Sequence, residues 1–386
     1  METFESNETT LVENVRAELL GQKIGLKAPR RIGDRVQSST NPLNVAWSSI
    51  RMFRSLEICS EVLRARHQSL SEEEHKESSK AIATYIDHAY EYFQVASGCS
   101  QYTAPLLYYY SFLNLAKALV ESRKPNFRER PSHRNHGLSS HKKDSYKISA
   151  TPNPGVFQEL NEVATGIPFK DSFICGIKEI FRMIPPIDLE SRMAFKESAS
   201  TVYIDKIFAS KDELSDKYWM TLGFNRQALT NAKTTIADII QTPGISSSFI
   251  PINGNMPSPE LYIQSNNAFE RHDSVLLEDT IYEHAKHWPI YPSVMRHTDG
   301  QPRPDFYLML QKNIACSDPL SSTCILFMAF FWLGSIVRYD PSLARMIYDS
   351  NYVYPVEGLY SQCIVDFVEQ VEWLLWDRMQ LVVSSR

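Results

Sequence analysis

The chain has 386 residues, of which 43% are hydrophobic and 22% are charged, and its formal net charge is −5. This composition is typical of a soluble globular protein, and it excludes one that binds nucleic acid through a high overall positive charge. The length is enough for two domains, or for one large helical domain with an insertion.

Cysteine spacing and hydropathy indicate the cellular compartment in which we expect the protein. None of the six cysteines lies in a C-x-x-C pair, and their spacing matches no zinc site, so we expect reduced core cysteines in a cytoplasmic protein. The first 14 residues are acidic and lack the apolar segment of a signal peptide. The longest apolar run, 324–337, is too short to span a bilayer, which predicts a buried helix and no membrane insertion.

Changes in sequence pattern predict a mainly α protein in four parts. Residues 1–40 form an N-terminal arm with one short helix and a basic connector. Residues 41–195 form a helical domain that contains a basic loop at 123–149. Residues 196–310 form a smaller, mixed α+β insertion, and residues 311–386 form C-terminal helices that pack back on the bundle.

Three helices are predicted at the start of the helical domain. Pro42 opens the first, in which apolar residues recur with a period near 3.6 as far as Leu63. Ser71-Glu72-Glu73-Glu74 is a capping-box start for the second. The third spans 102–120. Short connections between the three predict an antiparallel bundle.

The segment 123–149 is basic and lacks apolar periodicity, so we expect a loop with a short helical turn. A cluster of lysines and arginines attracts phosphates by releasing counterions. The candidate nucleic-acid-binding residues are Arg128, Arg130, His133, Arg134, His136, Lys142 and Lys143. The alternative interpretation is a surface loop that pairs with carboxylates elsewhere, such as Glu72–Glu74.

The remaining elements follow in order. Residues 170–184 predict a helix that Pro185-Pro186 stops, and 200–208 predict a strand because β-branched residues alternate there. Two more apolar helices are expected at 318–337 and 359–383.

Arg338-Tyr339-Asp340-Pro341 ends the first of these C-terminal helices. We interpret Arg338 as a structural residue that bonds the terminal carbonyls of that helix. The alternative is a buried arginine that reaches the His136 region.

Four segments together resemble the YaaC-like proteins of bacteria. They are Pro105-Leu106-Leu107-Tyr108-Tyr109-Tyr110, Asn114-Leu115-Ala116-Lys117-Ala118-Leu119, His136-Gly137-Leu138 and Arg338-Tyr339-Asp340-Pro341. The resemblance implies a mostly helical bacterial protein, with Arg338 and Tyr339 in a structural motif, and that family has no settled activity. Its relatives look like partners of ATPase or nuclease genes in antiviral defence clusters. The function implied is a non-catalytic subunit of a defence complex that contacts nucleic acid, a partner ATPase or a nuclease.

A looser resemblance is to the HEPN superfamily, whose helical bundles often act as metal-independent ribonucleases. Its signature is an arginine, a following polar residue, and a histidine separated from the arginine by four to six residues. Arg134 and His141 fit it, and the pairs Arg128–His133 and Arg130–His136 fit the bare spacing. The resemblance implies that Arg134 holds the scissile phosphate, that His141 transfers a proton, and that two subunits face each other as a homo-oligomer. The alternative is a solvated basic loop with incidental histidines.

Other motifs indicate little chemistry. Tyr108-Tyr109-Tyr110 could stack on bases, but consecutive helical residues point in different directions, which favours core packing with hydroxyls at the rim. His284 and His287 have helical spacing but no evident third ligand, so no metal site is predicted. The chain has no P-loop and no dinucleotide-binding glycine motif, and no cofactor is expected. A third alternative is a nucleotide or small-molecule sensor with its pocket in the 196–310 region.

Overall fold

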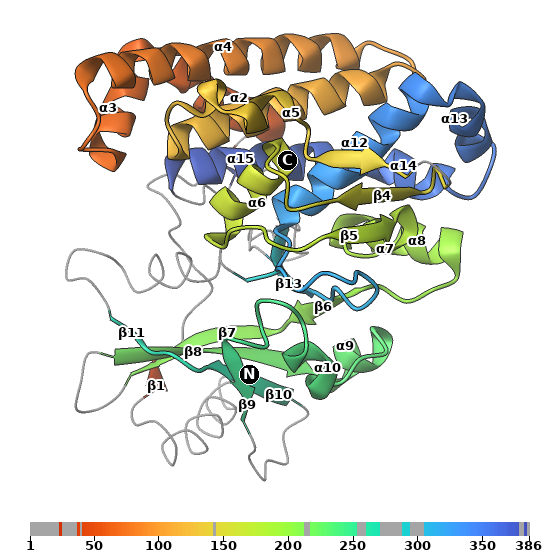
Figure 1. The fold of residues 1–386 in the computed structure, drawn as a ribbon. Coiled ribbons are helices and arrows are strands. Elements are labelled where there is room, and N and C mark those ends of the chain that lie inside the picture. Colours follow the sequence, from red (N-terminus) through yellow and green to blue (C-terminus); the bar gives the residue numbers. More distant parts are fainter. Residues whose placement is uncertain are drawn as a thin grey trace.

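The computed structural model describes residues 23–24, 37–38, 41–141, 144–211, 217–252, 260–270, 288–293, 305–377 and 382–383. Helices occupy the upper half of Figure 1, and a mostly β region lies below them. Lys142, Lys143, most of the predicted arm 1–40 and the segment 283–287 lie outside the described residues. The expectation of a mainly α fold with a smaller mixed region is confirmed at this coarse level.

Two long helices, α4 (Glu72–Ser97) and α5 (Ala104–Arg123), lie side by side across the top of Figure 1. The predicted capping box at the start of α4 is present. The Ser71 side chain accepts from the backbone N–H of Glu74, and the Glu74 carboxylate accepts from the backbone N–H of Ser71. A cap of this kind stabilises a helix by about 1 kcal/mol, so local sequence alone starts α4 at this residue.

The prediction of a single helix from Pro42 is wrong in one respect, because the structure divides this segment into three parts. Its parts are α2 (Pro42–Arg51), the 3₁₀ turn η1 (Met52–Arg54) and α3 (Leu56–Arg66). Ser55 is extended and caps α3 with its side chain. The break lets Phe53 turn inward, where it is fully buried with its ring centroid 4.6 Å from that of Trp376.

The central core helix is α12 (Ser322–Tyr339). It is long and apolar enough to cross a membrane, but 78% of it is buried inside the protein, as in the core helix predicted for this segment. It ends at Asp340, whose side chain caps α13 (Pro341–Tyr348). The predicted helix end at Arg338-Tyr339-Asp340-Pro341 is therefore confirmed.

The last predicted helix, 359–383, has different bounds. It is built from α14 (Val353–Gly358), a π-helical turn η5 (Leu359–Cys363) and α15 (Ile364–Trp376). The helix stops where Asp377 adopts a left-handed conformation with φ of 55°. Two partly buried arginines on other helices, Arg66 and Arg123, pair with Asp377 at this end.

Aromatic residues join the helices into one core. The ring of Phe112 on α5 stacks on that of Phe367 on α15 at a centroid distance of 4.1 Å. Phe112 also contacts Phe330 of α12 edge-on at 4.7 Å. All three are fully buried, and each such burial contributes about 2 kcal/mol. Helices α5, α12 and α15 thus share a core.

The described part of the predicted basic loop contains short elements. They are the 3₁₀ turns η2 (Phe127–Glu129) and η3 (Pro131–Arg134) and strands β3 (Leu138–Ser140) and β4 (Lys147–Ala150), and helix α6 (Val156–Thr165) follows the loop. The predicted helix 170–184 is partly wrong. Residues Phe173–Gly176 form strand β5, because alternate side chains of this stretch are buried where it pairs antiparallel with β4.

Only the end of that stretch is helical, and the chain then returns toward the β region. These elements are α7 (Ile177–Phe181), the 3₁₀ turn η4 (Pro185–Ile187) and α8 (Asp188–Phe195).

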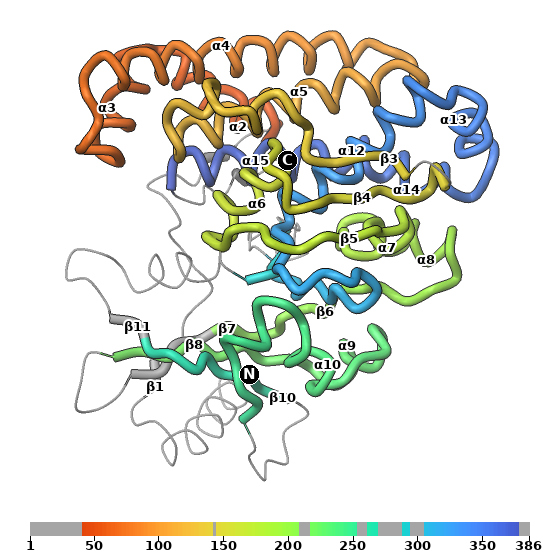
Figure 2. The backbone as a smooth tube through the Cα atoms, in the orientation of Figure 1, coloured from red at the N-terminus to blue at the C-terminus, as the bar shows by residue number. Residues whose placement is uncertain are grey.

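The lower region of Figure 2 is built from antiparallel strands. One sheet has the order β12 (Ile290–Ser293), β13 (Asp305–Met309) and β6 (Thr201–Ile204). The larger sheet contains β1 (Lys23–Ile24), β7 (Lys206–Lys211), β8 (Lys217–Asn225), β10 (Glu260–Ser265) and β9 (Phe249–Pro251), with β11 (Phe269–Glu270) also paired to β8.

Two short helices flank the larger sheet, α9 (Arg226–Asn231) and α10 (Ile236–Ile240). A short parallel pair joins β14 (Val382–Val383) to β2 (Gln37–Ser38). One buried contact ties the β region to the helices: the Tyr291 hydroxyl donates to the Asp366 carboxylate of α15 at 2.6 Å.

Candidate functional site

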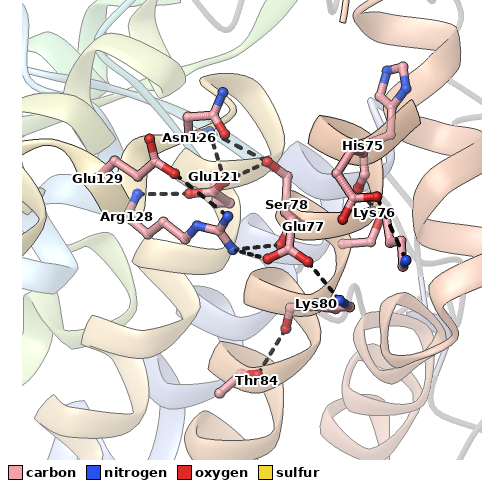
Figure 3. A network of polar contacts seen from close by, with 12 residues as sticks. His75, Lys76, Glu77, Ser78, Lys80, Thr84, Glu121, Asn126, Arg128 and Glu129 are labelled. Carbon is pink, nitrogen blue, oxygen red and sulfur yellow. Dashed lines mark hydrogen bonds and ion pairs between the residues drawn. The ribbon is translucent and has the colours of Figure 1, made fainter. Parts of the chain in front are cut away.

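A buried carboxylate fixes the start of the basic loop. Glu121 is fully buried near the end of α5, where it accepts from the Ser78 hydroxyl at 2.7 Å. It also accepts from the backbone N–H groups of Asn126 at 2.9 Å and Arg128 at 3.0 Å (Figure 3). Asn126 is left-handed, with φ of 64°. One carboxylate therefore organises the turn through which the chain leaves α5 and enters the loop.

The Arg128 side chain is occupied by acidic partners. Its guanidinium donates to the backbone carbonyl of Glu77 at 2.9 Å and lies 3.3 Å from that residue's carboxylate (Figure 3). It also lies 3.7 Å from the Glu129 carboxylate. Its position supports the alternative stated for this loop, pairing with carboxylates of α4, although the partner is Glu77 rather than Glu72–Glu74.

The middle of the loop docks on the first turn of α6. The backbone N–H groups of Val156 and Phe157 donate to the carbonyls of Asn135 and His136 at 2.9 and 3.0 Å. Gly137 follows with φ of 80°, and a Cβ there would lie 2.0 Å from a side-chain oxygen of Gln158. Glycine is therefore required at this turn, which holds the backbone of His136 in place.

The imidazole of His136 is held by a tyrosine of α5. Its Nδ1 lies 2.5 Å from the hydroxyl oxygen of Tyr109. Burial raises the pKa of Tyr109, and burial together with the charges of Lys117 and Arg338 lowers the pKa of His136. The neutral imidazole accordingly accepts the tyrosine proton at Nδ1 and keeps its own proton on Nε2. In the described part of the chain, Nε2 has no hydrogen-bond partner.

The imidazole of His133 is likewise held by a tyrosine hydroxyl, in this case from α4. Its Nε2 lies 2.7 Å from the hydroxyl oxygen of Tyr85 on α4, and burial raises the pKa of Tyr85 to about 12. The pKa of His133 is lowered by partial burial and by the charges of Lys117 and Arg134. Both loop histidines are therefore neutral at physiological pH and oriented by a phenol.

The charge of Lys117 lowers the pKa of both histidines, so its ammonium lies within electrostatic range of each. Its own pKa is lowered by burial. The ammonium has no hydrogen-bond or ion-pair partner among residues 41–141 or the other described segments. A partly buried cation without a counter-charge is costly, and it favours binding of an external anion.

Arg338 approaches from the end of α12. Its guanidinium donates to the hydroxyl of Tyr110 at 2.7 Å and lies 4.9 Å from the ring centroid of Tyr339. Helices α5 and α12 can meet here because a Cβ on Gly334 would already lie 3.1 Å from the Tyr109 Cβ. Arg338 is exposed, in contrast to the buried arginine of the alternative interpretation, but its charge does reach His136.

These residues form one group from four parts of the chain, which we call the Tyr–His cluster. Its members are Tyr85, Tyr109, Tyr110, Lys117, His133, His136 and Arg338. It presents two cations, imidazole N–H donors and tyrosine hydroxyls. No group of histidine, cysteine and acidic residues suited to a metal occurs among the described residues. The cluster suits an anion with several oxygen acceptors.

The other predicted site residues are placed separately. Arg130 and Arg134 are exposed, and neither has an ion-pair partner in the part of the chain that the structure describes. His141 lies after β3, where its backbone N–H donates to the Lys147 carbonyl. Its Nδ1 is buried without a described hydrogen-bond partner. No hydrogen bond or ring contact joins Arg134 to His141 within these described segments.

The β region contains a separate open pocket of about 420 Å³. Its polar lining includes Arg226, Thr230 and Tyr262, and its apolar lining includes Leu229 and Leu261. The volume lies in the range of small-molecule sites. This pocket lies within the 196–310 region, where the sensor alternative predicts a ligand pocket.

The sequence pattern indicated no site role for Lys117, and for Tyr109 only base stacking, over which core packing was favoured. A usable signal was the helical spacing of Tyr110, Asn114, Lys117 and Glu121, which share one face of α5 inside an otherwise apolar sequence.

Comparison with known proteins identifies one family. The family model described as YaaC-like Protein matches residues 51–372, which is more than half of the chain. No curated protein and no solved structure matches the chain.

Proposed function

Because this chain belongs to the YaaC-like family, and because the four segments of that resemblance contribute to one cluster, we propose that the Tyr–His cluster binds phosphate groups of nucleic acid. The protein would act as a non-catalytic subunit that holds nucleic acid for other components. The observation that supports this most directly is the partly buried ammonium of Lys117, which has no ion-pair partner among the described residues and whose charge lowers the pKa of the His136 imidazole.

Phosphate suits the cluster better than a neutral ligand does. Its oxygens can accept from the Lys117 ammonium, from the His136 Nε2–H and from guanidinium N–H groups of Arg338 that Tyr110 leaves available. Arg130 and Arg134 lie exposed on the same loop and would contact neighbouring phosphates. Arg128 contributes less, since Glu77 and Glu129 already neutralise it.

The biological setting is proposed from the family resemblance. We place the protein in the bacterial cytoplasm, as a subunit of an antiviral defence complex beside a partner ATPase or nuclease. The sequence motifs of nucleotide hydrolysis and serine hydrolases are missing from the full sequence, which supports a role in binding.

A second candidate function is metal-independent RNA cleavage by an endoribonuclease of the HEPN type. The observation that favours it is the pair of neutral, oriented imidazoles of His133 and His136 beside the charges of Lys117 and Arg134. The lone pair of each imidazole accepts from a tyrosine hydroxyl, so its remaining N–H could donate to a phosphate oxygen, and nearby cations can stabilise a phosphorane. The original pair Arg134 and His141 stays part of this candidate.

One experiment separates the two functions. Single-stranded RNA is incubated in EDTA with the wild type and with the variants His136→Ala, Arg134→Ala and His141→Ala. The binding function predicts intact RNA, retarded on a native gel by the wild type and less by His136→Ala. Cleavage that is abolished by one or more of these substitutions would replace binding by the nuclease function. Arg345→Ala, an exposed arginine on α13, is the matched control.

A further inference from the structure

The charges of the Tyr–His cluster match one phosphomonoester. A terminal phosphate has a charge of about −1.5 to −2 at neutral pH, whereas an internal phosphodiester has a single negative charge. The two cations of the cluster, Lys117 and Arg338, both lie close enough to His136 to lower its pKa. They can therefore neutralise one dianionic group at this position.

Burial of the Lys117 ammonium also favours a terminal phosphate of a nucleic-acid strand over an internal one. Lys117 is partly buried on α5, within electrostatic range of the partly buried imidazoles of His133 and His136. A terminal phosphate protrudes from its nucleotide, while an internal phosphate is flanked by sugars on both sides. The protruding group can reach a recessed ammonium at lower steric cost.

On the α4 side, the surface around the cluster does not continue as a basic track, and the further exposed cations, Arg130 and Arg134, lie on the loop. Helix α4 borders the cluster through Tyr85, but it exposes Glu73 and Glu91, and the loop exposes Glu129. These carboxylates would repel successive phosphates of a long strand laid across the helix. On the α4 side, the described charge pattern thus favours one strong phosphate position over many weak ones.

Two exposed aromatic rings stand next to the phosphate position. Tyr339 is 71% exposed beside Arg338, and Tyr92 is 37% exposed with its ring centroid 5.5 Å from that of Tyr110. Either ring offers a face for a nucleobase, and a stacked base contributes sequence-tolerant affinity. A base and a phosphate of one nucleotide could be held together here.

We infer that the Tyr–His cluster recognises a nucleotide with a terminal phosphomonoester, with Lys117, His136 and Arg338 on the phosphate and Tyr339 or Tyr92 against the base. This inference rests on the proposed function, since it names the phosphate-bearing group that the same site takes. The chemistry is shared by the 5′-phosphorylated end of a nucleic acid and by a free mononucleotide.

The test compares two short single-stranded RNAs of one sequence, labelled at the 3′ end, with either a 5′-phosphate or a 5′-hydroxyl. Fluorescence anisotropy with the full chain should show tighter binding of the phosphorylated RNA by about ten- to a hundredfold. Lys117→Met should remove most of that preference, and Lys117→Arg should restore part of it. Lys76→Met, which removes an exposed lysine of α4, should leave the preference unchanged. Melting curves confirm that the variants fold.

Competition with unlabelled AMP shows whether the recognised phosphomonoester belongs to a nucleic-acid end or to a free mononucleotide. Displacement of the phosphorylated RNA by AMP at similar affinity identifies a free mononucleotide as a ligand, and weak displacement identifies a nucleic-acid end. Equal binding of the two RNAs, with equal sensitivity to Lys117→Met, would overturn the inference and leave the proposed function in place. Absence of binding to either RNA and to AMP would overturn both.

Discussion

The hydroxyl oxygen of Tyr109 lies 2.5 Å from Nδ1 of His136 and joins the core helix α5 to the loop that sequence analysis singled out for its charge. We predict that this contact sets the tautomer of the imidazole. In the wild type, nitrogen-15 NMR should show His136 with its proton on Nε2 and a pKa below 6.5, because burial and two nearby cations disfavour the charged form. In Tyr109→Phe the tautomers should mix, and stability should fall by about 1 kcal/mol. An unchanged spectrum would contradict this role of Tyr109.

The Glu121 carboxylate should be the main anchor of the loop. Glu121→Gln leaves one of its buried N–H donors facing an amide N–H, so we expect a loss of about 2 kcal/mol or more in the free energy of unfolding, measured with urea. Glu73→Gln on the exposed side of α4 is the matched control and should change stability by less than about 0.5 kcal/mol. Similar losses in the two variants would show that Glu121 does not anchor the loop.

The left-handed turn at Gly137 should tolerate no side chain. In Gly137→Ala the new Cβ meets Gln158 at 2.0 Å, and φ of 80° adds backbone strain, so we expect a loss of about 2 kcal/mol or more and weaker RNA binding. Gly98→Ala provides the comparison, because its Cβ would meet only a carbonyl at 3.8 Å. That variant should be neutral or slightly stabilising. Thermal melts of both variants test the difference.

Stability should fall as pH rises from about 4 to 7 through the buried carboxyl of Asp366. Burial raises its pKa from 3.8 to about 7, the Tyr291 hydrogen bond acting in the opposite direction. The folded state therefore holds a proton that the unfolded state has released, and unfolding becomes easier with increasing pH in this window. The difference between 3.8 and about 7 corresponds to on the order of 4 kcal/mol, complete at about pH 7.

Asp366→Asn isolates this effect, since the amide stays neutral and its oxygen can still accept from Tyr291. The two loop histidines titrate in the same range with the opposite sign, because their folded pKa values are lowered. They are common to both proteins, so the difference between the two urea-unfolding curves reports Asp366 together with its effect on Glu369, whose pKa burial and the Asp366 charge raise. The variant should gain stability relative to the wild type between pH 5 and pH 8. Parallel curves would show that Asp366 keeps an ordinary pKa.

Local signals predicted the helical part of the fold well. Ser71 and Glu74 define the start of α4 through contacts within four residues, and Asp340-Pro341 ends α12 in the same local way. The strand at 173–176 could not be found from periodicity, since its apolar residues also fit a helix and only pairing with β4 decides between them. The end of α15 at Asp377 likewise depends on two distant arginines.

The candidate site was only partly accessible from sequence. The basic loop and its histidines were found from composition, and the segments of Lys117 and Arg338 appeared through the family resemblance. Which cations pair with carboxylates depends on tertiary contacts: Arg128 lies against Glu77, while Lys117 has no described partner. The order of charged residues in the sequence cannot distinguish a cation that pairs with a carboxylate from one that does not. The tyrosine triplet divided as expected for core packing, with Tyr108 and Tyr109 buried and Tyr110 at the rim.

The salt dependence of RNA binding tests the central claim most directly. Anisotropy titrations of the wild type, Lys117→Met and Lys76→Met are compared across a range of salt concentrations. If Lys117 contacts a phosphate, its removal should weaken binding about tenfold or more and reduce the slope of log K against log salt by about one, with no change for Lys76→Met. Equal affinities and slopes for all three proteins would contradict phosphate binding at the Tyr–His cluster.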